Sequence, residues 1–503
     1  MKKNGKFCEI ASFFPIILLT FARLCDKIES LNRGANEHEY LRHFSEIGKL
    51  GRRLGKGIFA EAQTLPAALG IRVNTRLTVT VVKHYLFLPY PLPILAILQG
   101  FSGICCADGA SRPFLFSIIS LAFLWPIKAR EIFALAFLGR LGVFMKKFNV
   151  GVIGATGMVG QRFLTLLANH PWFNVTALAA SSRSAGKTYE EVVGEKWAFE
   201  SPIPEKFKGM TILDAEKDID TIAQLVDFVF CAVNMDKAKI QALEEVYAKR
   251  EIPVVSNNSA HRFTPDVPMI IPEINAEHLE VIDAQRKRLH TKRGFIAVKS
   301  NCSLQSYVPL LHPLKKFGIK CAAVCTYQAI SGAGKTFETM PEILDNIIPY
   351  IGGEEEKSER EPLKIWGEVK DGEIALTNSP VITAQCLRVP VSDGHTAAVF
   401  VSFENKPSKE EILKAWSEFK GEPQTLALPS APAQFLKYLE EDNRPQAKLD
   451  RMEGNGMSVT VGRLRSDLIF DYKFVGLSHN TLRGAAGGAV LLAELLAAKG
   501  YFD

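Results

Sequence analysis

Residues 149–160 read NVGVIGATGMVG, and this stretch decides the fold of the chain that follows it. Apolar residues alternate over Asn149–Ile153, as in a β-strand, and a helical apolar pattern begins at Val159. Between them, the GxxGxxG spacing allows a tight turn and a close approach of the backbone to a pyrophosphate at the helix N-terminus. A second apolar run, Val175–Ala180, completes a strand–helix–strand unit. The stretch therefore predicts a Rossmann-like dinucleotide site with the contact residues Gly154, Thr156, Gly157, Met158, Val159 and Gly160.

The end of the second predicted strand indicates which dinucleotide binds. NAD-specific sites usually place a carboxylate there to bind the ribose 2′-hydroxyl. Here residues 181–187 read SSRSAGK, with hydroxyls and two cations but no carboxylate. This composition suits a 2′-phosphate, so we predict NADP, with contacts from Ser181, Ser182, Arg183 and Lys187. The alternative is a solvated basic loop without a ligand.

Further strands are predicted at Phe228–Val233 and Ile252–Ser256. The latter leads into a polar loop, residues 257–262, at a carboxyl strand end, where open α/β sheets bind ligands. Ser259 and Arg262 in this loop are candidates for binding a phosphate.

Cys302 is the candidate nucleophile. It lies in KSNCSLQ, residues 299–305, between the apolar run Gly294–Val298 and a helical pattern that begins at Leu304. A thiol at a helix N-terminus meets unpaired N–H groups and the positive end of the helix dipole, which favour the thiolate. We therefore expect an activated thiol that forms a thioester with a carbonyl substrate.

The pattern changes after Cys302. Apolar strand candidates surround a charged, helical stretch near residues 340–367, and these candidates are Cys321–Ala329, Ala397–Phe403, Val459–Leu464 and Asp467–Val475. We expect an α+β catalytic and dimerisation domain with a mostly antiparallel sheet over 301–478, after a Rossmann-like NADP-binding domain over 145–300. A final helix, 479–503, with an apolar face is expected to pack back on the NADP-binding domain.

Several residues of this second half are candidate site residues. Arg388 and His395 lie seven residues apart around Pro390 and Gly394, a spacing that allows both to reach one cleft. His395 is a candidate acid/base, although a lone histidine is more often a packed or surface residue. Gln328 and Gly332 lie in or beside a glycine-rich loop that we expect to shape the pocket. Glu361 and Lys364 share one helix face, and from their spacing alone this face is interpreted as a charged surface.

The chain's net charge of +6 combines two unlike pieces. Residues 1–144 carry 18 Lys and Arg against 9 Asp and Glu, which leaves 42 against 45 for residues 145–503. The second piece is therefore near neutral, which excludes nucleic-acid binding by a basic surface. Its five scattered cysteines have no zinc-ligand spacing, so we expect no metal and a reducing compartment.

Residues 1–144 do not resemble a domain. The uncharged stretch His84–Ala107 is interrupted by three prolines, Pro113–Ile127 is short for a bilayer span, and the start resembles a signal peptide. We favour the interpretation that residues 1–144 are upstream sequence included by a misplaced start codon, because a self-sufficient domain begins after Met145. A targeting segment, a membrane anchor and an extra domain are the alternatives. We expect a cytoplasmic enzyme, because export would separate it from its cofactor.

The motifs of residues 146–503 together resemble the aspartate-semialdehyde dehydrogenase family. In chain order the matching segments are GATGMVG (154–160), SSRSAGK (181–187), SNNSAHR (256–262), PEIN (272–275), SNCS (300–303), QAISGAG (328–334), ExxK (361–364), RVPVSDGH (388–395), NRPQAKLDR (443–451), GMSVTVGRLR (456–465) and SHNTLRGAAGGA (478–489). Ser303 departs from the Thr that is frequent there, and the first 144 residues have no counterpart.

The resemblance implies a role for each matching residue. Cys302 would be the nucleophile, His395 the acid/base and Gln328 the residue that orients the acyl intermediate. Arg388 would bind the substrate α-carboxylate, Glu361 its ammonium, and Lys364 and Arg262 phosphate, while Asn480 would return to the nicotinamide. We also predict Gly332 as a cofactor contact. The implied reaction is the NADPH-dependent conversion of 4-phospho-L-aspartate to L-aspartate 4-semialdehyde and phosphate, in lysine, methionine and threonine biosynthesis, by a homodimer or homotetramer.

Two rival functions remain open at this point. One is another acyl reductase on the same plan, acting on N-acetylglutamyl phosphate or on a coenzyme A thioester such as malonyl-CoA. Glu361 argues against it, because only a substrate with a free ammonium needs an anion there. The other is a membrane-attached, nucleotide-binding protein without catalysis, which the presence of Cys302, Gln328 and His395 disfavours.

Overall fold

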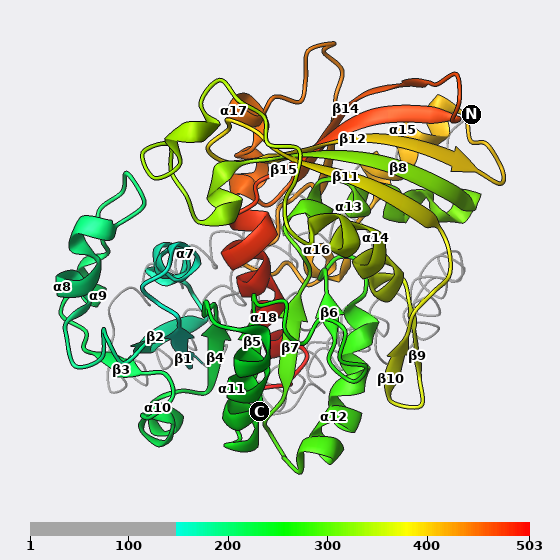
Figure 1. The fold of residues 1–503 in the computed structure, drawn as a ribbon. Coiled ribbons are helices and arrows are strands. Elements are labelled where there is room, and N and C mark those ends of the chain that lie inside the picture. Colours follow the sequence, from blue (N-terminus) through cyan, green and yellow to red (C-terminus); the bar gives the residue numbers. More distant parts are fainter. Residues whose placement is uncertain (1–146) are drawn as a thin grey trace, which may run out of the picture. The chain divides into compact units, whose positions relative to one another are not determined.

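The computed structural model describes residues 147–503, and the whole N-terminal segment discussed above lies outside this range. Two sheets organise the described residues (Figure 1). The first has seven parallel strands in the order β3-β2-β1-β4-β5-β7-β6. Their bounds are β1 Phe148–Ile153, β2 Phe173–Ala180, β3 Ile212–Asp214, β4 Phe228–Cys231, β5 Val254–Ser256, β6 Met269–Ile270 and β7 Ile296–Lys299.

Helices cover both faces of this parallel sheet. Val150 and Val152 of β1 point into one apolar cluster with α7 (Met158–Leu167) and α18 (Gly487–Ala498). The next residue, Ile153, points into the opposite cluster with α10 (Ile219–Leu225) and α11 (Lys237–Lys249), because side chains alternate along a strand. The remaining helices of this half are α8 Tyr189–Val193, α9 Glu205–Lys208 and α12 Ile282–Leu289. The arrangement confirms the predicted Rossmann-like fold.

The second sheet has six strands in the order β11-β8-β12-β15-β14-β13. Their bounds are β8 Ile319–Gln328, β11 Val381–Arg388, β12 His395–Phe403, β13 Leu436–Leu439, β14 Val459–Ser466 and β15 Tyr472–Ser478. The three central pairings are antiparallel and the two edge pairings are parallel, so the sheet is mixed but mostly antiparallel, as predicted. A separate hairpin joins β9 (Glu368–Lys370) to β10 (Glu373–Ala375).

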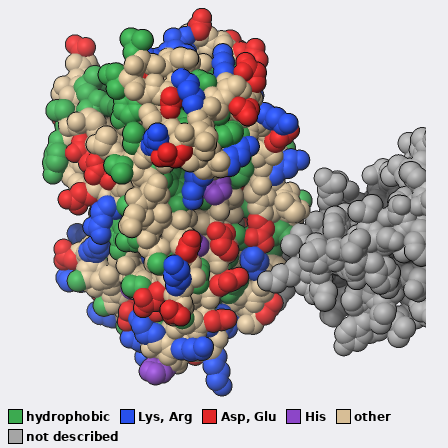
Figure 2. All heavy atoms as spheres, turned by 90° about the vertical axis from the view of Figure 1, so that its right-hand side faces the viewer, with side chains coloured by type: hydrophobic (Ala, Val, Ile, Leu, Met, Phe, Trp, Pro, Cys, Tyr) green, Lys and Arg blue, Asp and Glu red, His purple; other side chains and the backbone are tan. Residues whose placement is uncertain are grey.

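One face of the six-stranded sheet is packed and the other is open. Along β8 and β12 buried residues alternate with half-buried ones, and the half-buried set includes Cys325, Tyr327, Ala398 and Phe400. The packed face contacts α13 (Val308–Leu311) and α15 (Lys409–Glu418) in one continuous core. Figure 2 views the molecule from the side of β8 and α15. Hydrophobic side chains gather toward the upper left of this view. The shorter helices of this half are α16 Glu422–Thr425 and α17 Ala447–Asp450.

Four local expectations were inaccurate. The helix predicted from Leu304 is broken into α13 and the flanking 3-10 turns Ser303–Ser306 and His312–Phe317, because Pro309 and Pro313 interrupt the α-helical hydrogen bonds. The charged helix α14 begins only at Glu354 and ends at Ile365. The strand predicted from Asp467 begins at Tyr472, because Asp467 Oδ1 accepts the N–H groups of Ile469 and Phe470 in a turn.

The last helix also differs from its prediction. Instead of one apolar face, residues 487–497 of α18 are buried on all sides. The helix packs on β5, β7 and α7 (Figure 1), as the predicted return to the nucleotide-binding sheet requires. A Cβ at Gly487 or Gly488 would collide with the carbonyls of Leu482 or Arg483, so glycine is required where the preceding turn runs into the helix.

Candidate active site

The ends of the two sheets bring the predicted site residues together. In the parallel sheet, β1, β5 and β7 end in the glycine-rich turn, the 257–262 loop and the loop that carries Cys302. In the second sheet, the parallel pairing of β8 with β11 places Gln328 beside Arg388, and the neighbouring strand β12 begins at His395. Three polar side chains that are far apart in sequence therefore emerge at one end of the second sheet.

Cys302 precedes a 3-10 turn of four residues, Ser303–Ser306, rather than the α-helix that the sequence predicts. Asn301 holds the turn, since its Oδ1 accepts hydrogen bonds from the N–H and the hydroxyl of Ser303, each at 2.7 Å. Gly484 closes over the nucleophile: a Cβ there would lie 2.8 Å from the Cys302 Cβ. The C-terminal segment therefore fixes the thiol from one side.

The expected activation of the thiol by a helix dipole is wrong for this structure. Burial raises the pKa of the Cys302 thiol, and the negative charge of Glu354 raises it further. Three cations, Lys299, Arg262 and Arg388, act in the opposite direction without reversing the shift. The buried surroundings of Cys302 therefore favour the thiol over the thiolate.

His395 lies beside the thiol, with 3.4 Å between its Nε2 and the Cys302 Sγ. The Nδ1 of its ring accepts the Ala329 backbone N–H at 3.0 Å, so the neutral ring carries its hydrogen on Nε2, toward the sulfur. Complete burial lowers the pKa of His395 well below its usual value, and the positive charge of Arg388 lowers it further. The imidazole is therefore a neutral hydrogen-bond donor at the nucleophile.

Gly332 and Arg388 complete this side of the site. The Arg388 guanidinium donates from Nη1 to the Ala329 carbonyl at 2.7 Å. A Cβ at Gly332 would lie 3.0 Å from the His395 Cε1 and 3.1 Å from the Arg388 Nη1. The structure therefore places Gly332, which the sequence assigned to the cofactor, directly against the two side chains next to the nucleophile.

Glu361 and Arg262 form a buried ion pair under the Cys302 loop. Arg262 Nη1 donates to Glu361 Oε1 at 2.8 Å, and the second oxygen of Glu361 accepts the Asn301 N–H at 2.7 Å. Ser259 lies half-buried in the same turn, where its carbonyl accepts the Arg262 N–H. Arg262 and Glu361, which were expected to bind the phosphate and the ammonium of the substrate, are thus paired with each other.

Lys364, for which the resemblance implied phosphate binding, has its ammonium bound to backbone carbonyls. Its ammonium donates to the carbonyls of Thr264 and Val267, at 2.7 and 2.9 Å. Burial lowers the pKa of Lys364 to about 7. The one-turn spacing from Glu361 correctly indicated a shared helix face, but that face is buried rather than solvated.

Four polar residues near the nucleophile were missed by the sequence analysis. Glu354 is buried and accepts hydrogen bonds from Asn301 and Gln328. Lys299, whose pKa burial lowers to about 7, donates to the carbonyls of Ser300 and Gly484. Asn257 has both side-chain polar atoms buried and without a partner among the described residues. Asn257 and Asn301 lie within the quoted SNNSAHR and SNCS segments, but no spacing rule singles them out.

The glycine-rich turn has the geometry expected of an anion site. Gly154 has φ +86°, and a Cβ there or at Gly160 would collide with backbone atoms. Gly157 is the N-cap of α7, whose first turn contains no acidic residue, and no side chain of the described residues caps it. Its first N–H groups are therefore available to a phosphate. Thr156, Met158 and Val159 are partly exposed beside them.

The loop after β2 differs from the buried cluster because its side chains are free in solvent. Ser181, Ser182, Arg183 and Lys187 are all exposed. The backbone is ordered by hydrogen bonds from Ser184 to Ser181 and from Gly186 to Ile212. Hydroxyls and cations stand where a carboxylate would select NAD, so the loop fits a 2′-phosphate.

Asn480 links the C-terminal segment to the catalytic loops. Its Oδ1 accepts the Gly394 N–H at 2.8 Å, and its Nδ2 donates to the Ser331 hydroxyl at 2.8 Å. It therefore orders the residues before His395 and the loop that contains Gly332. Both of its polar ends are already used in this structure.

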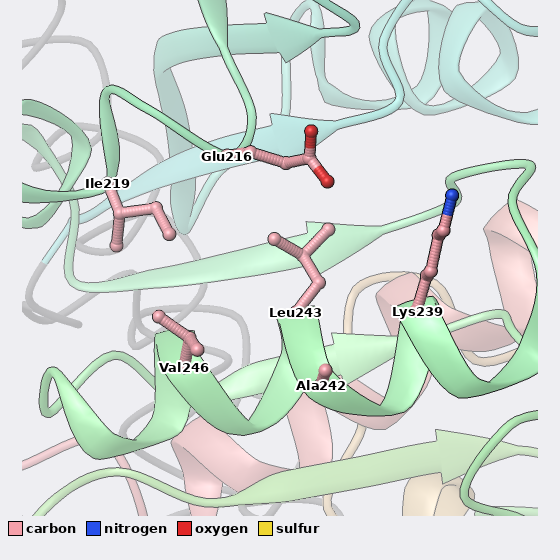
Figure 3. Close-up of a pocket in the computed structure, with 6 residues that line it drawn as sticks. All are labelled: Glu216, Ile219, Lys239, Ala242, Leu243 and Val246. Carbon is pink, nitrogen blue, oxygen red and sulfur yellow. The ribbon is translucent and has the colours of Figure 1, made fainter.

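A separate hollow of roughly 340 Å³ lies between α10 and α11. Figure 3 shows its lining, with Lys239, Ala242, Leu243 and Val246 on α11 and with Glu216 and Ile219 opposite them. None of the predicted site residues lines it. The candidate active site is therefore the buried cluster around Cys302 rather than this hollow.

The fold and the cluster define a class: a nucleotide-binding oxidoreductase fold with a cysteine nucleophile. Two family descriptions match, "Semialdehyde dehydrogenase, NAD binding domain" over residues 149–282 and "Semialdehyde dehydrogenase, dimerisation domain" over 311–483. Among curated proteins, the aspartate-semialdehyde dehydrogenase of Methanothermobacter thermautotrophicus is 45% identical, over 69% of this chain and 98% of its own length. That of Aspergillus fumigatus is 42% identical, over 71% and 98%.

Solved structures show the same similarity. The aspartate-semialdehyde dehydrogenase of Candida albicans with NADP has a TM-score of 0.64 and 39% identity, covering 71% of this chain and 100% of that one. An aspartate-semialdehyde dehydrogenase II of Vibrio cholerae, complexed with ASA, has a TM-score of 0.53 and 25% identity, covering 70% and 98%. This chain belongs to the aspartate-semialdehyde dehydrogenase family.

Proposed function

We infer that this protein catalyses the NADPH-dependent reductive dephosphorylation of 4-phospho-L-aspartate to L-aspartate 4-semialdehyde. The observation that carries the inference is the pair formed by the Cys302 thiol and the neutral His395 ring, 3.4 Å apart at the meeting point of the two sheet ends. A thioester accepts hydride far more readily than a carboxylate, so a cysteine nucleophile is the chemical requirement of this reduction. The pathway role, in lysine, methionine and threonine biosynthesis, follows from the family.

In the first step, the Cys302 sulfur attacks the acyl carbon and the bond to phosphate breaks. The thiol proton leaves with the phosphate group, so the products are a thioester on Cys302 and inorganic phosphate. The His395 Nε2–H faces the sulfur and is placed to donate a hydrogen bond to it once the thiol proton has left. Gln328 is assigned to orienting the acyl group and Arg388 to binding the α-carboxylate. The ion pair of Arg262 with Glu361 rearranges when the substrate's phosphate and ammonium enter.

The residues present fit NADP. The collisions that a Cβ would make at Gly154 and Gly160, the uncapped N–H groups of α7 and the exposed cations after β2 are all features of a dinucleotide-phosphate site. Bound there, NADPH would supply the hydride that turns the acyl group into an aldehyde. Asn480 and Gly332 remain proposed cofactor contacts. Asn480 hydrogen-bonds to the loop that contains Gly332 and to Gly394, next to His395.

The division of labour that we propose follows the two sheets. Residues 145–300 form the NADP-binding domain, 301–478 the catalytic and dimerisation domain, and 479–503 the closing helix. The half-buried apolar face of β8 and β12 is a suitable surface for a second copy of the chain, so we propose at least a homodimer. Among residues 147–503 there is no helix both long and apolar enough to cross a membrane. A cytoplasmic location, where NADPH is available, is part of the proposal.

The deciding experiment is an assay in the oxidative direction. L-aspartate 4-semialdehyde and NADP⁺ should give NADPH only when inorganic phosphate is added. N-acetylglutamate semialdehyde with phosphate and malonyl-CoA with NADPH serve as rival substrates. Turnover with either rival and none with aspartate semialdehyde would overturn the substrate assignment, and no turnover with any of them would overturn the activity.

A further inference from the structure

Glu354 is the first residue of α14, and its carboxylate is buried, with the residue only 8% exposed. Glu361 lies two turns further along the same helix face and belongs to the ion pair with Arg262. The carboxylates of Glu354 and Glu361 both contact Asn301, the residue before the nucleophile. α14 therefore supports the Cys302 loop at two points. Of the two glutamates, only Glu361 was singled out from the sequence, and then as a ligand of the substrate's ammonium.

The hydrogen bonds of Glu354 reach two different elements of the site. Both of its oxygens accept from Asn301 Nδ2, each at 3.0 Å, and Oε2 accepts from Gln328 Nε2 at 3.3 Å. Asn301 belongs to the loop after β7, and Gln328 ends β8 of the other sheet. The Glu354 carboxylate thus links the C-terminal ends of β7 and β8, one strand from each of the two sheets that build the active site.

We propose that Glu354 is a positioning residue of the reaction, which holds the side-chain amides of Asn301 and Gln328 in place and sets the charge that the Cys302 sulfur meets. The inference rests on the function proposed above. Among the described residues, Glu354 makes no hydrogen bond to the sulfur or to His395, so it acts through the two amides and through its field.

The charges around the nucleophile explain the second part of this role. The groups that face the sulfur come from five elements: Glu354 on α14, Lys299 on β7, Arg262 after β5, Arg388 on β11 and His395 on β12. Glu354 is the carboxylate in this set, and its charge adds to burial in raising the pKa of the thiol. It therefore opposes ionisation of Cys302 while the site is empty of substrate.

Lys357 partly neutralises the charge of Glu354 and so weakens its effect on the Cys302 thiol. Its ammonium donates to Glu354 Oε1 at 2.7 Å, one turn further along α14, and its side chain is about a third exposed. Because this cation can move into solvent, the carboxylate has a neutralising partner that does not lock it. Replacing Lys357 leaves the two amide contacts in place but removes the neutralising charge.

The test is Glu354→Gln in the full-length protein, with Glu356→Gln as the matched control, since Glu356 lies on the same helix and is exposed. Glutamine keeps the shape of the side chain and one acceptor, but its NH2 group replaces the second oxygen and faces the donating amide of Asn301 without being able to accept from it. Two readouts are compared: kcat for phosphate-dependent NADP⁺ reduction, and the pH dependence of Cys302 alkylation by iodoacetamide.

The two readouts should move in opposite senses. For Glu354→Gln, kcat falls by about 100-fold, because the amides lose their orientation. The alkylation midpoint moves to lower pH, because an anion has left the vicinity of the sulfur. Glu356→Gln leaves both unchanged. A merely structural role would lower turnover and alkylation together, without moving the midpoint, and that result overturns the proposal.

Lys357→Met keeps the test decisive if Glu354→Gln does not fold. Here the alkylation midpoint should move to higher pH, because the carboxylate is no longer neutralised, while NADPH still binds. An unchanged midpoint overturns the charge role. Failure of the proposed function has a different signature: the wild-type protein itself would lack phosphate-dependent activity, whereas failure of this inference leaves the wild type active.

Discussion

The loop after β2 and the cluster around Cys302 both contain cations for anionic ligands, yet they differ in burial. Arg183 and Lys187 are exposed side chains on an ordered turn. Arg262 and Arg388 are buried, and each donates to a neighbour within the protein. An exposed cation keeps its hydration until the ligand arrives, whereas a buried one must be paired to exist at all. The role of the exposed cations can therefore be predicted from local composition, whereas the role of the buried cations can be predicted only when their partners are known.

The largest effect is expected on the buried side, at the nucleophile. Cys302→Ser should retain NADPH binding and lower turnover by at least about 10³-fold, because a serine hydroxyl is a far weaker nucleophile than cysteine at neutral pH. Fluorescence titration with NADPH and the phosphate-dependent assay measure the two properties. Substantial turnover in this variant would rule out the thioester mechanism.

Arg483→Met tests how strongly buried charges depend on each other. Arg483 forms a two-point ion pair with Glu273 and also donates to Gln305 at 3.0 Å, all in the interior. Removing one partner of such a pair should lower the free energy of unfolding by about 3–5 kcal/mol. The control is Arg250→Met, which breaks an exposed pair with Asp220 and should cost less than about 1 kcal/mol. Urea denaturation that showed equal losses would remove the distinction between the two kinds of charge.

Arg183→Ala tests the exposed side. Loss of one charge-assisted hydrogen bond to a 2′-phosphate costs about 1.5–3 kcal/mol, so NADPH affinity should fall about 10- to 100-fold. NADH affinity should hardly change, since it has no 2′-phosphate. Parallel titrations with the two dinucleotides measure the difference. An equal loss for both would indicate a solvated loop without a role in cofactor choice.

Gly332→Ala separates two assignments for one residue. A methyl group there would press on the His395 ring and the Arg388 guanidinium, both held by other hydrogen bonds. We expect kcat to fall about tenfold with KM for NADPH unchanged. Steady-state kinetics with varied NADPH decide the point: a raised KM with normal kcat would return Gly332 to the cofactor site.

Much of the fold follows from local pattern. The alternation over 149–153, the glycine spacing and the second strand predicted the nucleotide-binding unit, because each of these signals is complete within about 30 residues. Short or unpunctuated strands such as β3, β6 and β13 escaped notice. β11, which carries Arg388, was also missed, because its pairing partner β8 lies more than 50 residues earlier and only the register between them reveals it.

The site was predicted less completely than the fold. Cys302, His395, Gln328 and Arg388 do converge, as expected. Glu354 was overlooked because a glutamate in an acidic helix start is, in sequence, indistinguishable from its half-buried neighbour Glu355 and its exposed neighbour Glu356. Its burial is decided by where α14 meets the Cys302 loop, which is a property of the packed chain.

By itself, the amino-acid sequence determined the nucleotide-binding architecture and the preference for NADP, and it singled out Cys302 as the proposed nucleophile, since these predictions depend on residue types at short, fixed spacings. Only the tertiary structure decided the protonation of that nucleophile, the tautomer of His395 and the pairing of Arg262 with Glu361. Such properties depend on burial and on charges brought within a few ångströms by distant parts of the chain, where low dielectric strengthens every interaction. Local sequence cannot encode a field that the whole fold creates.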